Sequence, residues 1–313
     1  MSRQVGIRGF MYIVDMHCDS LLTVSGDLGL INSYNVSSKY PQIQFFAEFC
    51  PKGQDTPELR RRKILRLLNT YLYECDRLGI EKLKCVKDLM DATRDDLRCA
   101  VLSLEGGGGL FADSEELNTL AGAGLLVMGM AWDKNELSSS AWDKEDTGLT
   151  EEGKKMCKRA MELGIILDVS HLSDKAFYDT LEYYQAPLLA THSNFREVCA
   201  SPRNLTRDMA LRIASRGGVI GINIYPPFLN DSGAATIDDI YRHVDYGLEY
   251  IGENHIGFGF DIDGVDGNYP KGISLASSIH EQVIDKLLSR YSASTVEKIA
   301  GENVINFLAD NML

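Results

Sequence analysis

Short runs of β-branched and other apolar residues alternate along the chain with longer stretches whose apolar positions recur at helical spacing. The short runs predict buried strands, and the longer stretches predict amphipathic helices. We predict eight strands, at Tyr12–Met16, Lys82–Val86, Ala100–Leu104, Leu125–Met130, Ile165–Val169, Leu188–Thr191, Val219–Ile224 and Ile256–Phe260. Helical sequence separates most of them, so the chain consists of repeated strand–helix units.

Capping residues mark several of the helices. Thr150 precedes a predicted helix over Glu151–Leu163, and Gly164 follows it. A threonine at the N-cap and a glycine just past the last turn are typical of helix ends. The segment Glu58–Leu78 also has apolar residues at helical spacing, and its cluster of basic residues is interpreted as a solvated face.

Repeated strand–helix units are compatible with a closed parallel barrel or with an open, doubly wound sheet. Reactive side chains at the ends of many different strands favour the barrel, because its strand C-termini all meet on one face. We therefore expect an α/β fold, a (β/α)₈ TIM barrel of the metal-dependent hydrolase type. A chain of 313 residues without repeats or long linkers fits a single domain over residues 1–313.

Composition excludes several classes of function. The net charge of −13 would repel nucleic acids and anionic membranes, so we expect neither as a partner. The seven cysteines include no C-x-x-C pair, which argues against a disulfide framework and a zinc ribbon and favours a reducing cytoplasm. The apolar run Phe10–Val14 is too short for a signal peptide or a membrane span.

Histidines and acidic residues follow several of the predicted strands. His17 and Asp19 lie two residues apart after the first strand, so both side chains can chelate one metal ion. Such a pair is common and alone is a weak signal. Glu105, His171 and His192 end three further strands, where burial is costly unless the group is paired or metal-bound. Satisfied core histidines would explain any one of these positions, but they explain the whole set poorly.

An acidic residue also follows the last predicted strand. Asp261 lies close after Gly257 and Gly259, which allow close backbone approach to a site. A carboxylate beside a metal-activated water is a natural general base. The following Asp263-Gly264 pair is interpreted as a turn.

These motifs, in this order and spacing, resemble those of the membrane dipeptidase (renal dipeptidase-like) family, zinc peptidase family M19, among the amidohydrolase-like barrels. The resemblance runs from about Val14 to Leu308. It includes the stretch Gly148-Leu149-Thr150, which leads to His171, and the stretch from Val198 to Asn204.

The resemblance implies two zinc ions. It places His17 and Asp19 on the first ion and His171 and His192 on the second, with Glu105 bridging both. Such nitrogen and oxygen ligands suit zinc, and carboxylate-rich sites of this kind also accept manganese or cobalt. Asp261 matches the acid that transfers the proton during hydrolysis.

The resemblance also implies substrate-binding residues. Arg203 matches the arginine that holds the C-terminal carboxylate of a dipeptide, and Tyr225 matches a substrate-contacting tyrosine. One position departs from the family pattern, because Trp132 stands where most relatives have the histidine that steadies the substrate carbonyl. This substitution puts transition-state stabilisation and substrate range in doubt.

The implied activity is metal-dependent hydrolysis of small dipeptides, including those with a D-residue at the C-terminal position. One alternative is hydrolysis of another small amide, such as a lactam or an acyl-amino acid, because fold alone does not decide the reaction. A second is a metal-binding homologue without activity. The expected partner is a small dipeptide, and a homodimer is left open.

Overall fold

The computed structural model describes residues 11–23, 35–49, 56–265 and 267–313. Its parallel strands form a closed ring, in which β9 pairs with both β8 and β1, and β2 pairs with both β1 and β4. The strands of the ring are β1 (Ile13–Cys18), β2 (Gln42–Phe49), β4 (Cys99–Glu105), β5 (Leu125–Gly129), β6 (Ile166–Asp168), β7 (Leu189–Ala190), β8 (Val219–Ile222) and β9 (Ile256–Phe258). The expected (β/α)₈ barrel is confirmed.

One predicted strand is wrong. Of Lys82–Val86, only Lys82 is in a strand, the two-residue β3 (Glu81–Lys82), which pairs with the start of β4 outside the ring. The second strand of the barrel is instead β2, which the sequence did not predict. Its residues Gln42 and Gln44 are polar but buried, and the Gln44 side-chain amide donates to the carbonyl of Asp15. Because these buried glutamines are polar, the segment lacks the apolar pattern from which the other strands were predicted.

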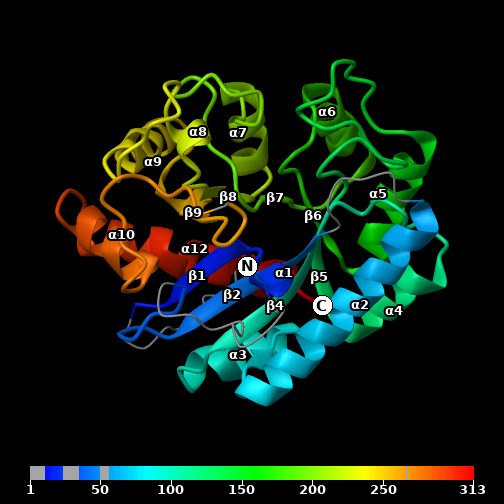
Figure 1. The fold of residues 1–313 in the computed structure, drawn as a ribbon, viewed down its shortest axis with the longest axis horizontal. Helices are drawn as coiled ribbons and strands as arrows, with labels where there is room; N and C mark the ends of the chain where they lie inside the picture. Colours follow the sequence, from blue (N-terminus) through cyan, green and yellow to red (C-terminus); the bar gives the residue numbers. More distant parts are fainter. Residues whose placement is uncertain (1–10, 24–34, 50–55, 266) are drawn as a thin grey trace.

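Helices surround the strands (Figure 1). The longer ones are α2 (Pro57–Leu78), α3 (Val86–Arg94), α4 (Glu115–Ala123), α5 (Glu151–Leu163), α6 (Asp174–Tyr183), α7 (Arg207–Ser215), α9 (Asp239–Tyr250), α10 (Ile279–Leu288) and α12 (Asn303–Asn311). Short helical segments are α1 (Ser20–Thr23), α8 (Pro226–Leu229), η1 (Glu253–His255), α11 (Ala293–Glu297) and η2 (Lys298–Glu302). None of the helices in the described ranges is both long and apolar enough to cross a bilayer.

The predicted caps of α5 are confirmed. The Thr150 side chain accepts a hydrogen bond from the Gly153 amide at 3.1 Å. Gly164 ends the helix with a φ of 70°, a left-handed conformation that favours glycine. Both caps hold α5 between the loop that follows β5 and strand β6.

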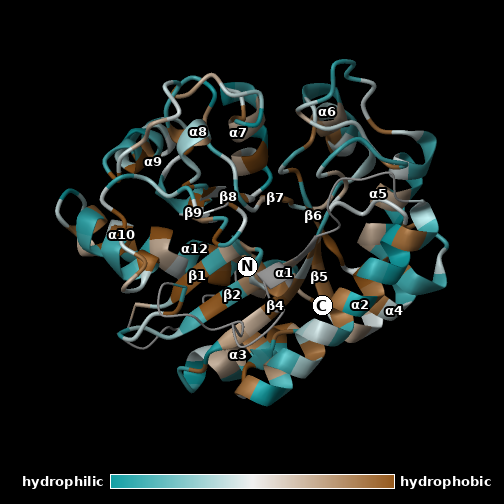
Figure 2. Ribbon diagram, in the orientation of Figure 1, coloured by the Kyte–Doolittle hydropathy of each residue, from teal (hydrophilic) through white to brown (hydrophobic). Residues whose placement is uncertain are grey.

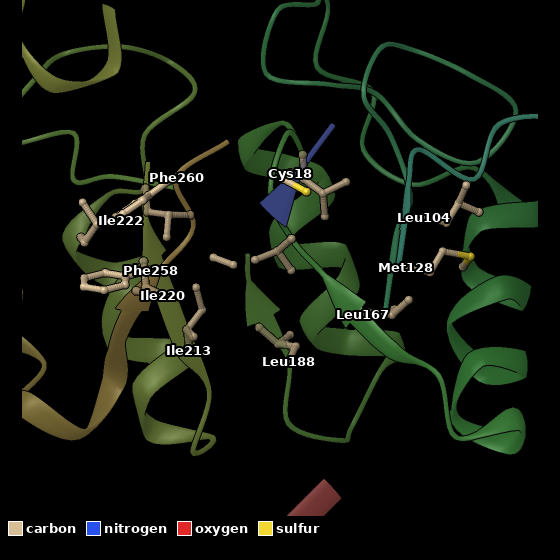
Figure 3. Close-up of a cluster of buried hydrophobic side chains, with 14 of the residues drawn as sticks. Cys18, Leu104, Met128, Leu167, Leu188, Ile213, Ile220, Ile222, Phe258 and Phe260 are labelled. Atoms are coloured by element: carbon tan, nitrogen blue, oxygen red, sulfur yellow. The ribbon is translucent and has the colours of Figure 1, made fainter. Parts of the chain in front are cut away.

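Apolar side chains fill the space between strands and helices. Brown strands lie at the centre of Figure 2, and the outer helices carry many hydrophilic residues. Figure 3 shows part of this core, where Ile222 and Phe258 from neighbouring strands lie side by side. A Cβ added to Gly221 or Gly257 would lie 2.9 or 3.1 Å from the Met16 methyl, so these glycines let β1, β8 and β9 pack closely. The barrel is thereby a rigid support for the strand ends.

Candidate metal centre

The C-terminal ends of β1, β4, β6 and β7 bring the five predicted ligands together. The Oε2 atom of Glu105 lies 3.6 Å from His17 Nε2. The other carboxylate oxygen, Oε1, lies 2.6 Å from His171 Nε2 and 3.1 Å from His192 Nε2. Asp19 Oδ2 is 3.8 Å from His17 Nε2. The two oxygens of Glu105 therefore face different sets of side chains.

In the part of the chain that the structure describes, two groups of side chains offer ligand atoms within 4.8 Å of one another: His17, Glu105 and His192, and His17, Asp19 and Asp261. Among the described residues, His17 Nε2 and Asp19 Oδ1 are buried atoms that have no hydrogen-bond partner. Buried polar atoms without a partner are costly, and a divalent cation would satisfy both. The residues present therefore fit a metal ion.

A chain of hydrogen bonds orients His192. The hydroxyl of Thr191 lies 2.6 Å from Asp168 Oδ2, which can only accept, so the hydroxyl proton points there. The same hydroxyl oxygen is 2.8 Å from His192 Nδ1 and must accept a proton from it. This arrangement leaves the lone pair of the imidazole on Nε2, the atom that faces Glu105.

Irregular backbone aims several of these side chains. The register between β1 and β2 shifts between Asp15 and Cys18, around His17. His171 and Asp261 have φ values of 66° and 61°, in the left-handed region that non-glycine residues rarely occupy. Such strain persists where the surrounding structure enforces it and is typical of functional sites. Sequence alone does not reveal these distortions.

The structure also shows a buried pair that sequence reasoning missed. His280 on α10 donates from Nε2 to Asp15 Oδ2 at 2.7 Å, and both side chains are fully buried. The other oxygen of Asp15 accepts from the amides of Phe260 at 3.0 Å and His17 at 3.3 Å. Asp15 thus joins the ends of β1 and β9. The only sequence signal was the acid two residues before His17.

Asp261 lies at the edge of this cluster. Its Oδ1 is 3.8 Å from His17 Nε2, and its Oδ2 accepts from the Asn223 amide at 3.0 Å. A Cβ added to Gly264 would lie 2.1 Å from Asp19 Oδ2 and 2.2 Å from Asp261 Oδ1. Only glycine fits here, so the predicted Asp263-Gly264 turn also shapes the site.

Burial dominates the protonation of the cluster. It raises the pKa of Glu105 well above its usual value, and it lowers the pKa of His192 and His171 well below theirs. The ionised Glu105 carboxylate is therefore costly here unless a cation compensates it, whereas neutral imidazoles are the form that binds metals.

Asp261 and His17 differ from these groups. Burial raises the pKa of Asp261 to about 7, although His17 acts in the opposite direction. Burial lowers the pKa of His17, but Glu105, Asp19 and Asp261 together raise it to about 10. Acidic groups that converge on one imidazole form the charge arrangement that a divalent cation would satisfy.

The three predicted substrate-binding residues have different surroundings. Arg203 is buried, and its guanidinium donates to the Ser193 hydroxyl at 3.0 Å and to the His192 carbonyl at 3.1 Å. The ring centroid of Trp132 lies 6.2 Å from that of His171. Tyr225 instead packs edge-on against Phe228, with 5.0 Å between ring centroids.

A pocket lies beside Glu105. Its lining comprises Arg60, Glu105, Gly106, Gly108, Trp132, Asp133 and Asn135. The proposed ligand Glu105 therefore borders this pocket, and Trp132 forms part of its wall.

A family model of the membrane dipeptidases, peptidase family M19, matches residues 6–311. The chain belongs to this family. An uncharacterised protein of Klebsiella pneumoniae from the pqqA 5′ region is 34% identical over 224 residues, which cover 65% of this chain and 83% of that protein. Dipeptidase tcpJ of Claviceps purpurea is 30% identical over 227 residues, or 71% of this chain. The match spans 53% of that relative, about half its length.

Solved structures show the same fold. A metallo peptidase from Rhodobacter sphaeroides, liganded with a phosphinate mimic of the dipeptide L-Ala-D-Ala, has a TM-score of 0.85. It is 23% identical, and the match covers 97% of this chain and 100% of that chain. The probable dipeptidase PvdM from Pseudomonas aeruginosa has a TM-score of 0.77 at 20% identity, over 85% of each chain.

Proposed function

We propose that this M19-family protein is a binuclear zinc dipeptidase that hydrolyses small dipeptides. The observation that carries the proposal is the position of Glu105, whose two oxygens face His17 on one side and His171 with His192 on the other. A carboxylate placed in this way can bridge two ions. We propose His17 and Asp19 as further ligands of one ion, and the other two histidines as ligands of the second.

Bound zinc would supply Lewis-acid chemistry, polarising the scissile carbonyl and making water more acidic. The residues of the chain supply the rest. Asp261 holds or releases a proton at its carboxylate, the role of a general acid–base. Its bond to Asn223 keeps Oδ2 in place and leaves Oδ1 toward the cluster.

Arg203 is proposed to bind the C-terminal carboxylate of the dipeptide. Its two hydrogen bonds to the protein fix the guanidinium, and its Nε has no partner among the described residues. A guanidinium has five N–H donors and suits a carboxylate. We propose Trp132 as an indole N–H donor to the substrate carbonyl oxygen, and Tyr225 as a further substrate contact.

A free α-carboxylate distinguishes a dipeptide from a rival substrate such as a lactam, whereas an acyl-amino acid shares that carboxylate and lacks the free α-amino group. The mimic of L-Ala-D-Ala bound by the Rhodobacter relative supports a dipeptide, and we propose that a D-residue is accepted at the C-terminal position. We further propose that residues 1–313 form one catalytic domain. A cytoplasmic location and a homodimer stay predictions.

Elemental analysis and a substrate panel test the proposal. Protein purified without chelator should contain about two metal ions per chain, because five ligands with a shared carboxylate exceed one tetrahedral site. It should hydrolyse Ala-Ala and L-Ala-D-Ala but not their C-terminal amides. In Arg203→Ala, KM for the free dipeptides should rise about 10-fold or more, as expected for the loss of charge-assisted hydrogen bonds.

Three results would contradict these assignments. One ion per chain in fully active protein would reject the binuclear centre. Equal hydrolysis of free and amidated dipeptides would reject the carboxylate-binding role of Arg203 and favour a general amidase. Binding of metal without turnover of any substrate would identify an inactive homologue.

A further inference from the structure

The loop between β5 and α5 is fastened directly to a proposed metal ligand. The amide of Ala141 donates to the carbonyl of His171 at 2.8 Å. The next residue in the chain is Trp142, whose backbone is held in a tight turn. The Ser140 amide donates to Asp143 Oδ2 at 2.7 Å, and the Asp143 amide donates to the Ser140 carbonyl at 3.1 Å.

Asp146 fixes the far side of the same loop. Its carboxylate accepts from the Ser139 hydroxyl at 3.2 Å, from the Gly148 amide at 3.2 Å and from the Lys175 amide at 2.7 Å. Ser139 also lies 2.8 Å from the hydroxyl of Ser173, the N-cap of α6. The loop that presents Trp142 is therefore held at both ends and has a defined position.

Trp142 is an exposed aromatic residue on this loop between β5 and α5. Its side chain is 54% exposed, although its ring centroid lies 6.3 Å from that of Phe228, at an interplanar angle of 32°. Phe228 is 9% exposed and belongs to α8, which follows β8. The guanidinium carbon of Arg203 lies 5.8 Å from the centroid of the Phe228 ring. The exposed ring of Trp142 therefore lies next to Phe228, and the ring of Phe228 lies next to Arg203, the proposed carboxylate-binding residue.

We propose that Trp142 and Phe228 form an aromatic wall that binds the side chain of the dipeptide's C-terminal residue. This inference rests on the proposed function. The side chain and the carboxylate of that residue share one Cα, so a carboxylate held at Arg203 places the side chain within reach of the rings beside it.

The energetics favour this occupant. A large apolar ring in water gains free energy when another apolar group covers it, and aromatic contacts add a preference for flat partners. Phe228 is already largely covered, whereas Trp142 has most of its surface open. The enzyme should therefore prefer large apolar or aromatic C-terminal residues, and glycine there would gain nothing from the wall.

The test compares two substrates in the metal-loaded enzyme. For wild-type protein and Trp142→Ala, kcat/KM is measured on Ala-Phe and Ala-Gly. We expect the ratio of the two values to fall about 3- to 10-fold in Trp142→Ala, the size expected for one lost aromatic contact. Trp142→Phe keeps a ring and should retain most of the ratio. Tyr73→Ala, which removes a 66% exposed ring from α2, should leave it unchanged.

An unchanged Ala-Phe to Ala-Gly ratio in Trp142→Ala would overturn the proposal. If that variant also shifted from dimer to monomer in size-exclusion chromatography, Trp142 would be assigned to a contact between chains. Failure of the proposed function is distinguishable, because wild-type protein would then hydrolyse neither dipeptide.

Discussion

Replacing His280 by leucine should destabilise the barrel at the point where its first and last strands meet. The Asp15 carboxylate is fully buried, and His280 is its only side-chain partner among the contacts described above. Leucine fills similar space beside Phe260, whose ring stacks on His280 at 5.0 Å, but it provides no donor. One carboxylate oxygen would then remain buried without its hydrogen bond.

Breaking a buried pair by removing one partner costs about 3–5 kcal/mol. The backbone amides of Phe260 and His17 still bind the other oxygen of Asp15, which places the expected loss near the lower limit, about 3 kcal/mol. Because these amides belong to His17 and to the residue before Asp261, metal retention should weaken as well. His280→Gln keeps a hydrogen-bond donor, so it should lose less stability and less bound metal than His280→Leu.

Urea unfolding of the metal-free protein, followed by circular dichroism, measures the change in free energy, and elemental analysis measures metal retention. The same substitution in an Asp15→Asn background provides the control. Asparagine carries no charge that would be left uncompensated, so His280→Leu should lower the free energy of unfolding by less in the Asp15→Asn background than in the wild-type protein. A loss below about 1 kcal/mol, or an equal loss in both backgrounds, would refute the reasoning.

Further predictions concern protonation and the metal ligands. Asp261→Asn should retain metal but lower kcat by about 100-fold or more, and near-normal turnover would assign the base elsewhere. In Glu105→Gln, elemental analysis should show weakened binding of both ions, since loss of only one would contradict bridging. Burial lowers the pKa of His243 from 6.5 to about 4, so stability should fall as the pH drops from about 6.5 to 4, by about 3 kcal/mol in thermal or urea unfolding. His243→Gln should remove this contribution and leave that of the other buried histidines, His171 and His192, and an unchanged profile would exclude His243 as a source.

The strand ends that carry chemistry could be predicted from sequence because each follows an apolar run. His17, Glu105, His171 and His192 were placed in this way, and the structure brings them together. The pattern failed at β2, where buried glutamines are satisfied by side-chain hydrogen bonds to the backbone. Hydrophobicity does not record such bonds.

The sequence also could not assign His280 a role. Its pairing with Asp15 joins positions 265 residues apart, and no local pattern predicts so distant a contact. Trp142 was missed for a different reason, because its proposed role depends on a loop conformation and on a ring carried by α8. Local periodicity predicts elements, whereas these contacts depend on how the closed barrel places loops that are remote in sequence.

Closure of the ring between β1 and β9 has a consequence for biosynthesis. Asp15 accepts a hydrogen bond from the amide of Phe260, which is 245 positions later in the chain. At a translation rate of about 5–20 residues per second, the first strand waits roughly 12–50 s for its neighbour. During that interval the edge of β1 has no β9 to pair with, and His17 lacks Asp261. A ribosome-bound chain can therefore complete the proposed centre only after Asp261 has been synthesised, and until then the open strand edge is a natural target for chaperones.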